Sequence, residues 1–218
     1  MLINYNPKKT KLLLITFIIT ISVFLQGCVS WLVPKVEQNV TQLKPGAYEL
    51  DPDHATLLFK VKHLGLSDFV GSFDRFSVAL DFDPNNIEST QLHALIDITS
   101  LDVNNTNFEE QLAGKGWLNS NEYPQAEFTS KSIQKITSSE ASSQKYQFNG
   151  QLNWRGYTNP VQFIVTFNGG ANNWLTGKYT IGVSAVGQFN RSDFGMDKYK
   201  DFVSDQVNIE VYAEFQKG

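Results

Sequence analysis

The sequence has a single cysteine, Cys28, so no disulfide can form within the chain. Histidine is also scarce, and His54, His63 and His93 do not lie in the His-Glu-x-x-His or Cys-x-x-Cys spacings that bind metals. The chain also lacks a nucleophile elbow, a Walker loop and a glycine-rich dinucleotide loop. We therefore expect no metal site and no cofactor, and these absences disfavour an enzyme.

Basic residues are fewer than acidic residues: the chain has 18 Lys and Arg residues and 22 Asp and Glu residues. Three of the lysines fall within residues 1–27, which hold no acid, so the rest of the chain is more acidic still. A nucleic-acid-binding protein is excluded, since phosphate binding requires a basic face. The hydrophobic content of 41% is sufficient for one globular domain.

The amino terminus has the pattern of an export signal. Lys8, Lys9 and Lys11 precede an uncharged apolar run over residues 12–25. The run is shorter than the ~20 residues that span a bilayer, so we predict a signal peptide over 1–27 instead of a membrane anchor.

The end of this segment, Leu25-Gln26-Gly27-Cys28, resembles the lipobox of bacterial lipoproteins. The resemblance implies cleavage before Cys28 and attachment of acyl chains such as palmitate, which anchor the protein on a membrane facing the periplasm or the outside. In well-studied bacteria an aspartate after the cysteine retains lipoproteins at the inner membrane, so Val29 favours the outer membrane. Residues 28–45 then form a lipidated tether, and the folded domain spans 46–218.

Apolar and polar residues alternate with a period of two in most of this domain, which is typical of antiparallel strands with one solvated face. The alternating segments are 55–63, 78–82, 92–98, 146–154, 161–167, 179–189 and 207–215. About eight such strands are satisfied by closure into a β-barrel, and a β-sandwich is the alternative.

The connecting segments carry turn residues. We expect loops at Asp83–Asn86, Gly156–Pro160 and Asn168–Asn173, and a turn at Asp51-Pro52-Asp53 before the first strand. Thr106 to Glu109 has capping-box spacing, which predicts one short helix continuing to Lys115.

The inward faces of these strands are rich in aromatic residues and contain small residues at Gly150, Ala185 and Gly187. This combination fits either a slot for a small ligand or a tightly packed core. His63 ends one inward-facing set, so it is either a polar group at a cavity mouth or a core histidine. Arg191 and Asp193 are expected to pair within a turn.

Together these residues resemble the YceI-like family over about residues 46–217. The matching segments are Tyr48-Glu49-Leu50-Asp51 with His54, Phe59 to Gly65, Gly71-Ser72-Phe73, Tyr123-Pro124 with Phe128, Gly150-Gln151-Leu152, Arg155-Gly156 with Pro160-Val161, and Arg191 to Met196. The resemblance implies an all-β, lipocalin-like antiparallel barrel that binds a long apolar lipid such as a polyisoprenoid.

The resemblance and the alternation together predict the residues that line a cavity. They are Tyr48, Phe59, Val61, His63, Leu80, Phe82, Phe148, Leu152, Trp154, Phe163, Val165, Phe167, Ile181, Val183, Phe189 and Arg191. Of these, His63, Tyr48 and Arg191 are the candidates for recognising a polar head group.

One stretch departs from the family pattern. Where many relatives carry polar His-Leu-Arg-Ser and Asp-Phe-Phe sequences, this chain has residues 111–114 (Gln-Leu-Ala-Gly) and 116–118 (Gly-Trp-Leu). We therefore expect a neutral head, such as a quinone or an amide, in preference to a pyrophosphate.

The function that these features predict is an envelope lipoprotein that binds an isoprenoid, quinone or fatty amide for transport or sequestration. The alternative is a structural or interaction lipoprotein with a filled core and no ligand. A lipid-modifying enzyme with His63 or His54 as base is the third reading, and a homodimer is an open alternative.

Overall fold

The computed structural model describes residues 34–136 and 144–218, so the predicted signal peptide and Cys28 lie outside the described residues. Residues from Val36 onward belong to one compact unit. Its strands are β1 (Gly46–His63), β2 (Ser67–Phe73), β3 (Phe76–Phe82), β4 (Gln91–Asp97), β5 (Leu101–Asp102), β6 (Gln125–Ile136), β7 (Lys145–Trp154), β8 (Tyr157–Asn172), β9 (Tyr179–Asn190) and β10 (Val203–Lys217). Its helical segments are α2 (Thr106–Leu112) and the 3-10 turns η1 (Val40–Gln42), η2 (Ile87–Ser89), η3 (Ile98–Ser100) and η4 (Arg191–Phe194).

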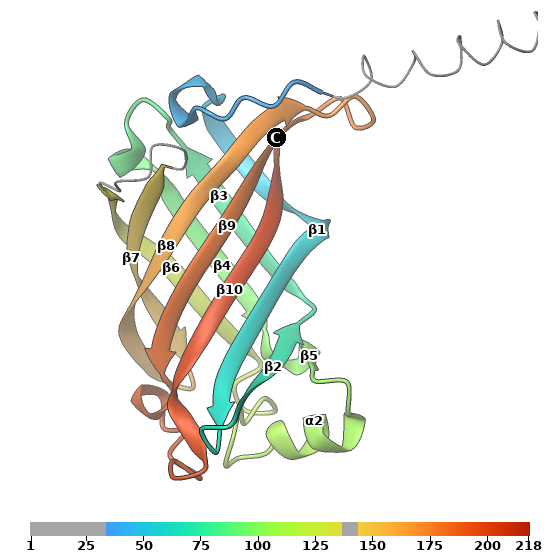
Figure 1. The fold of residues 1–218 in the computed structure, drawn as a ribbon, viewed down its shortest axis with the longest axis vertical. Helices are drawn as coiled ribbons and strands as arrows, with labels where there is room; N and C mark the ends of the chain where they lie inside the picture. The colour runs from blue at the N-terminus through green and yellow to red at the C-terminus, as the bar shows by residue number, and fades with distance from the viewer. Residues whose placement is uncertain (1–33, 137–143) are drawn as a thin grey trace, which may run out of the picture. The chain divides into compact units, whose positions relative to one another are not determined.

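The strands form one antiparallel sheet that closes on itself through pairing of β1 with β10 (Figure 1). β2 and β3 lie in succession along the same edge of β1, where β2 pairs with residues 58–63 and β3 pairs with residues 46–49. β5 pairs with β2 in the way that β4 pairs with β3. The wall is thus an eight-stranded closed barrel with one short helix, as predicted, and the β-sandwich is excluded.

The alternation in the sequence corresponds to the two faces of the barrel wall. In β7 every second residue from Tyr146 to Trp154 is buried, whereas its neighbours are half-buried or exposed. β2 and β6 were not predicted as strands. β6 has polar residues at inward positions and a register shift between Ser130 and Ser132. The irregular face of β6 hides the period of two.

Two predicted loops are in fact parts of β8. Arg155 and Gly156 alone form the turn from β7, with φ values of 54° and 78°, so Tyr157–Pro160 is already strand. At the other end, Gly169 adopts a φ of 136° beside a register shift in the pairing with β9. The glycine therefore makes a β-bulge, which bends the strand without ending it.

The Asp51-Pro52-Asp53 segment is also inside a strand. β1 contains a register shift against β10 between Leu50 and Ala55, so these residues form a bulge and not a turn that precedes the strand. The side chain of Asp51 accepts a hydrogen bond from the backbone N–H of Asp53 at 3.2 Å, which satisfies one donor that the bulge frees.

The predicted short helix is present with a cap one residue earlier than expected. Asn105 is the N-cap, since its side chain accepts a hydrogen bond from the N–H of Phe108 at 3.1 Å. Glu109 accepts in return from the N–H of Asn105. α2 ends at Leu112 and does not reach Lys115. No helix in the described ranges is long and apolar enough to cross a bilayer.

One end of the barrel is closed by the segment that precedes β1. Val40 and Leu43 are buried there, and Glu37 pairs with Gly170 of β8. The Tyr179 hydroxyl donates to Glu37 at 2.7 Å. Residues from Val36 therefore belong to the folded unit.

Glycines in the wall make room for aromatic rings on neighbouring strands. A Cβ on Gly187 would lie 2.5 Å from the ring of Phe163, and one on Gly71 would lie 2.5 Å from the ring of Phe59. A Cβ on Gly150 would meet the ring of Phe128 at a distance that real contacts do not reach. The gaps expected at Gly150 and Gly187 are thus filled by phenylalanine rings.

The close contact at Gly150 predicts a stability effect. In Gly150→Ala the new methyl group clashes with Phe128 and lies 2.5 Å from the carbonyl oxygen of Thr129, so we expect a loss of ~1–3 kcal/mol in the free energy of unfolding. Gly182→Ala in β9 is the matched control, because its Cβ would meet only Asn168 at an ordinary 3.6 Å. Denaturant unfolding of both variants measures the difference, and equal stabilities would contradict the prediction.

Candidate functional site

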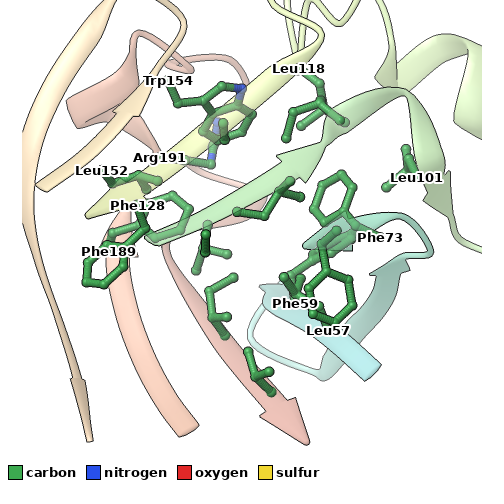
Figure 2. A pocket seen from close by; sticks show the side chains of 18 of the residues that line it. Leu57, Phe59, Phe73, Leu101, Leu118, Phe128, Leu152, Trp154, Phe189 and Arg191 are labelled. Carbon is green, nitrogen blue, oxygen red and sulfur yellow. The ribbon is translucent and has the colours of Figure 1, made fainter. Parts of the chain in front are cut away.

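The barrel contains a cavity of about 460 Å³, which begins beyond the buried cluster at the closed end and extends to the residues of α2. This volume lies within the ~300–1,000 Å³ range of small-molecule sites. The wall is almost wholly apolar, and the only titratable side chains among its described residues are His63 and Arg191. Figure 2 shows carbon-only side chains around the space, with nitrogen at Trp154 and Arg191.

The structure brings most of the predicted lining residues into this wall. Those that line it are Phe59, Val61, His63, Phe148, Leu152, Trp154, Phe163, Val165, Val183, Phe189 and Arg191. Strand alternation located all of them except Arg191, which lies in the 3-10 turn η4 after β9.

The remaining predicted residues face inward but do not line the cavity. Tyr48, Leu80, Phe82, Phe167 and Ile181 belong to the buried cluster at the closed end. Alternation identifies the inner face of a strand but not the position along the barrel axis where packing ends and open space begins. The Tyr48 hydroxyl donates to the carbonyl of Lys44 at 2.6 Å, and burial raises its pKa to about 12, so Tyr48 is a core residue and not a head-group contact.

The prediction missed lining residues at the other end of the cavity. β2 supplies Phe69 and Phe73, α2 supplies Phe108 and Leu112, and the loop after α2 supplies Trp117 and Leu118. The rings of Phe69 and Phe108 meet edge to face at 5.6 Å between centroids. α2 and the loop after it have no period of two, and in β2 the period is short, covering Phe69, Gly71 and Phe73. Only the unusual apolar stretch at residues 116–118 marked the region.

This end of the cavity reaches the surface. His63 is exposed, and Phe69, Phe108 and Trp117 are half-buried although they line the cavity. Large apolar side chains are exposed close to His63, in the β1–β2 turn and in the loop before β10. Leu66 is 84% exposed and Phe202 is 56% exposed.

Arg191 lies in the wall at this end and is 3% exposed. Its Nε donates to the carbonyl of Ser204 at 3.0 Å, Nη1 donates to Met196 at 2.5 Å, and Nη2 donates to Val203 at 3.0 Å. Burial lowers the pKa of Arg191, an effect that the charges of Asp205 and Asp197 oppose. The predicted pairing with Asp193 is wrong, because the guanidinium donates instead to the carbonyls of Met196, after η4, and of Val203 and Ser204 in β10.

Three further contacts hold the loop after α2 over Arg191. The ring of Trp117 lies 5.9 Å from the guanidinium carbon of Arg191 and stacks on Tyr199 at 5.7 Å between centroids. The Arg155 guanidinium donates to the carbonyl oxygen of Trp117. A cation next to an indole face is attracted by the ring quadrupole, so Trp117 and Arg191 stabilise each other.

The other histidines lie away from the cavity. His54, Asp51 and Glu214 each place one ligand atom within 4.8 Å of the others, on the outer side of the β1 bulge. The partners of Asp51 are His54 at 3.0 Å and Gln216 at 2.6 Å, and His54 has a side chain that is 60% exposed. His93 pairs with Glu127 at 2.6 Å. Neither His54 nor His93 is placed to act on a molecule inside the barrel.

The chain matches the model of the YceI-like domain over residues 48–215. A UPF0312 protein of Pectobacterium carotovorum is 30% identical over 168 residues, which cover 77% of this chain and 83% of the relative. Among solved structures, BcnA of Burkholderia cenocepacia superposes with a TM-score of 0.64 at 27% identity, covering 76% of this chain and 98% of BcnA.

A more distant structural neighbour is a polyisoprenoid binding domain from Saccharophagus degradans. It superposes with a TM-score of 0.55 at 11% identity and covers 80% of this chain and all of that domain. This likeness shows that the two share a fold.

The contacts of Arg191 predict that its shape, and not only its charge, stabilises the protein. In Arg191→Lys one ammonium group cannot reach all three carbonyls, so we expect a loss of ~2–4 kcal/mol in the free energy of unfolding. The control is Arg75→Lys, whose side chain is 63% exposed beside Asp97 and which we expect to cost less than ~1 kcal/mol. Chemical denaturation measures both, and a loss at Arg191 no larger than that at Arg75 would disprove the assigned role.

Proposed function

Because the chain belongs to the YceI-like domain family, we propose that it binds one long apolar lipid inside the barrel. The observation that carries this proposal is the cavity of about 460 Å³, whose wall offers hydrocarbon on every side except at His63 and Arg191. Water gains few hydrogen bonds in such a space, whereas an alkyl or isoprenoid chain forms close contacts with the whole wall.

The free energy of transfer from water favours a ligand with a large apolar surface, which is poorly soluble in water. A chain that buries about 400 Å² of apolar surface gains roughly 10 kcal/mol relative to water at ~25 cal/mol per Å². Part of this gain offsets the loss of motion on binding. Transfer from a bilayer gains far less, since the chain is dry there too. The protein therefore exchanges its ligand with membranes more readily than it releases it into water.

The proposed ligand classes are an isoprenoid, a quinone and a fatty amide. An isoprenoid is supported by the domain from Saccharophagus degradans, which has the same fold and is a polyisoprenoid binding domain. Trp117 and Leu118 line the cavity and carry no charge, which supports a head group without multiple charges.

The proposal places this activity in the cell envelope, where Cys28 carries the acyl chains and faces the protein towards the periplasm. Its support is the sequence around Cys28, together with the exposed apolar side chains near the opening, such as Leu66 and Phe202. Apolar residues at the rim let a lipid pass between a membrane and the cavity with little contact with water. Transport and sequestration both use this exchange.

A bulky residue inside the cavity should abolish lipid binding. Ala185 lines the cavity from β9, so Ala185→Trp fills the space that the chain would occupy. Its neighbour Val186 points outward and is 48% exposed, so Val186→Trp is the matched control. Native mass spectrometry of the full-length protein, followed by extraction and lipid identification, should find a stoichiometric lipid on the wild type and on Val186→Trp only.

Circular dichroism checks that both variants keep the barrel, and Ala185→Leu provides a smaller obstruction if the tryptophan prevents folding. A lipid retained by folded Ala185→Trp at wild-type stoichiometry would show that the cavity is not the site. A wild-type protein that carries no lipid and takes up none from an isoprenoid, quinone and fatty amide series would favour the alternative, an interaction lipoprotein whose barrel serves only as a scaffold.

A further inference from the structure

We infer that the closed end of the barrel selects lipids by chain length, and that Phe148 is the residue that determines where the chain ends. This inference rests on the proposed function, since it concerns the inner end of the same ligand. It adds a property that lipid binding alone does not require: the protein distinguishes two lipids with the same head when one chain exceeds the depth of the cavity.

The chemistry of the wall leaves shape as the means of discrimination. Every described lining residue except His63 and Arg191 has an apolar or aromatic side chain. His63 is exposed at the opening, and the guanidinium of Arg191 donates to three backbone carbonyls. Contacts between hydrocarbon groups are non-directional, so a wall of this kind distinguishes chains by the space that it offers them.

The inner end of this space is closed by aromatic rings in contact with one another. The ring centroids of Tyr48 and Phe82 are 6.2 Å apart. Phe167 contacts both Phe82, at 4.8 Å, and Tyr146, at 5.7 Å between centroids. All four residues are at most 4% exposed, and none of them lines the cavity. They form a packed layer behind the cavity, which we call the stop.

Hydrogen bonds on the far side from the cavity hold the stop in place. The Tyr48 hydroxyl donates to the carbonyl of Lys44 at 2.6 Å, and the Tyr146 hydroxyl donates to Oε1 of Gln144 at 3.0 Å. Each of these two tyrosine rings also pairs edge to face with a phenylalanine of the stop. Displacing the rings would break these hydrogen bonds and open a close-packed core, so a longer chain does not push them aside.

Phe148 forms part of the face that a chain meets at the stop. It is 1% exposed and belongs to the buried cluster at the closed end, yet it also lines the cavity. It follows Tyr146 on the inward face of β7, and Leu152 and Trp154 continue the cavity wall beyond it. The other residues that belong both to this cluster of buried residues and to the cavity wall are Val78, Val165, Val183 and Phe215.

The volume of the cavity predicts the length at which the stop acts. A methylene group is close in size to a water molecule, which takes up ~30 Å³ in the liquid, so a cavity of about 460 Å³ holds a chain of about 15 carbons. Up to that length, each added methylene leaves water for the cavity and increases the affinity about 4-fold. Beyond it, further carbons remain at the opening, near the exposed Leu66, and add little.

The test is a series of straight-chain alkanoic acids, from octanoic to icosanoic acid, which share one head. Their dissociation constants for the delipidated full-length protein are measured by displacement of a fluorescent fatty acid, at submicromolar concentrations where no micelles form. We expect the affinity to increase about 4-fold per carbon up to about 15 carbons and less than ~1.5-fold per carbon beyond that length. We call the length at which the gain ends the break.

Variants of the face move the break in opposite directions. Phe148→Ala removes a ring, so we expect the break to shift to chains longer by ~2–4 carbons. Val183→Phe adds a ring to the same face from β9, which should shift the break to shorter chains. Val40→Ala is the control, because Val40 is 1% exposed in the same cluster but does not line the cavity. Loss of folded protein lowers the affinity for all lengths alike and leaves the break in place.

The outcomes separate this inference from the proposed function. An affinity that increases evenly up to icosanoic acid, or a break that stays in place in either folded variant of the face, would overturn the stop while leaving lipid binding intact. Phe148→Leu replaces Phe148→Ala if the alanine variant does not fold. A wild-type protein that binds none of the acids, and no isoprenoid either, would overturn the proposed function itself.

Discussion

The pairing of β1 with β10 is the interaction on which the other features of this protein depend, because it converts a sheet into a closed wall. Once the first and last strands are joined, every inward side chain faces only other inward side chains, and no strand edge is left along β1 and β10. The bulge at Asp51 to His54 absorbs the extra residues of β1 without breaking this seam. A closed wall of eight strands then has room inside for either packed side chains or one ligand.

The barrel uses both possibilities, one at each end. At the closed end Val40, Leu43 and Tyr48 pack against the aromatic rings of β3 and β8, so the interior there is filled. Towards α2 the wall residues no longer meet across the axis, and the cavity begins. Phe128 and Phe163 lie over Gly150 and Gly187, so large rings are held against the wall and do not cross the space. The positions of these two rings against the wall therefore determine the shape of the cavity.

The sequence predicted the parts of this structure that follow from the alternation of apolar and polar residues along a strand. Alternation located most of the barrel strands and the inward faces, and hence Phe148, Leu152 and Val183 in the cavity wall. It could not distinguish these lining residues from Phe82 or Ile181, which also face inward but belong to the buried cluster at the closed end. The boundary between that cluster and the cavity depends on contacts between distant strands. The turn signals at Asn168–Asn173 were misread for a related reason: Gly169 serves a bulge, and only the pairing with β9 shows this.

The site around Arg191 serves stability. The guanidinium connects η4 to the start of β10 through three carbonyl groups, so the protein needs a buried cation here even without a ligand. The three carbonyls and the Trp117 ring next to the guanidinium together stabilise this cation where water does not reach it. Arg191 therefore joins these two segments, whereas the chemical character of the cavity comes from the hydrocarbon side chains that line it.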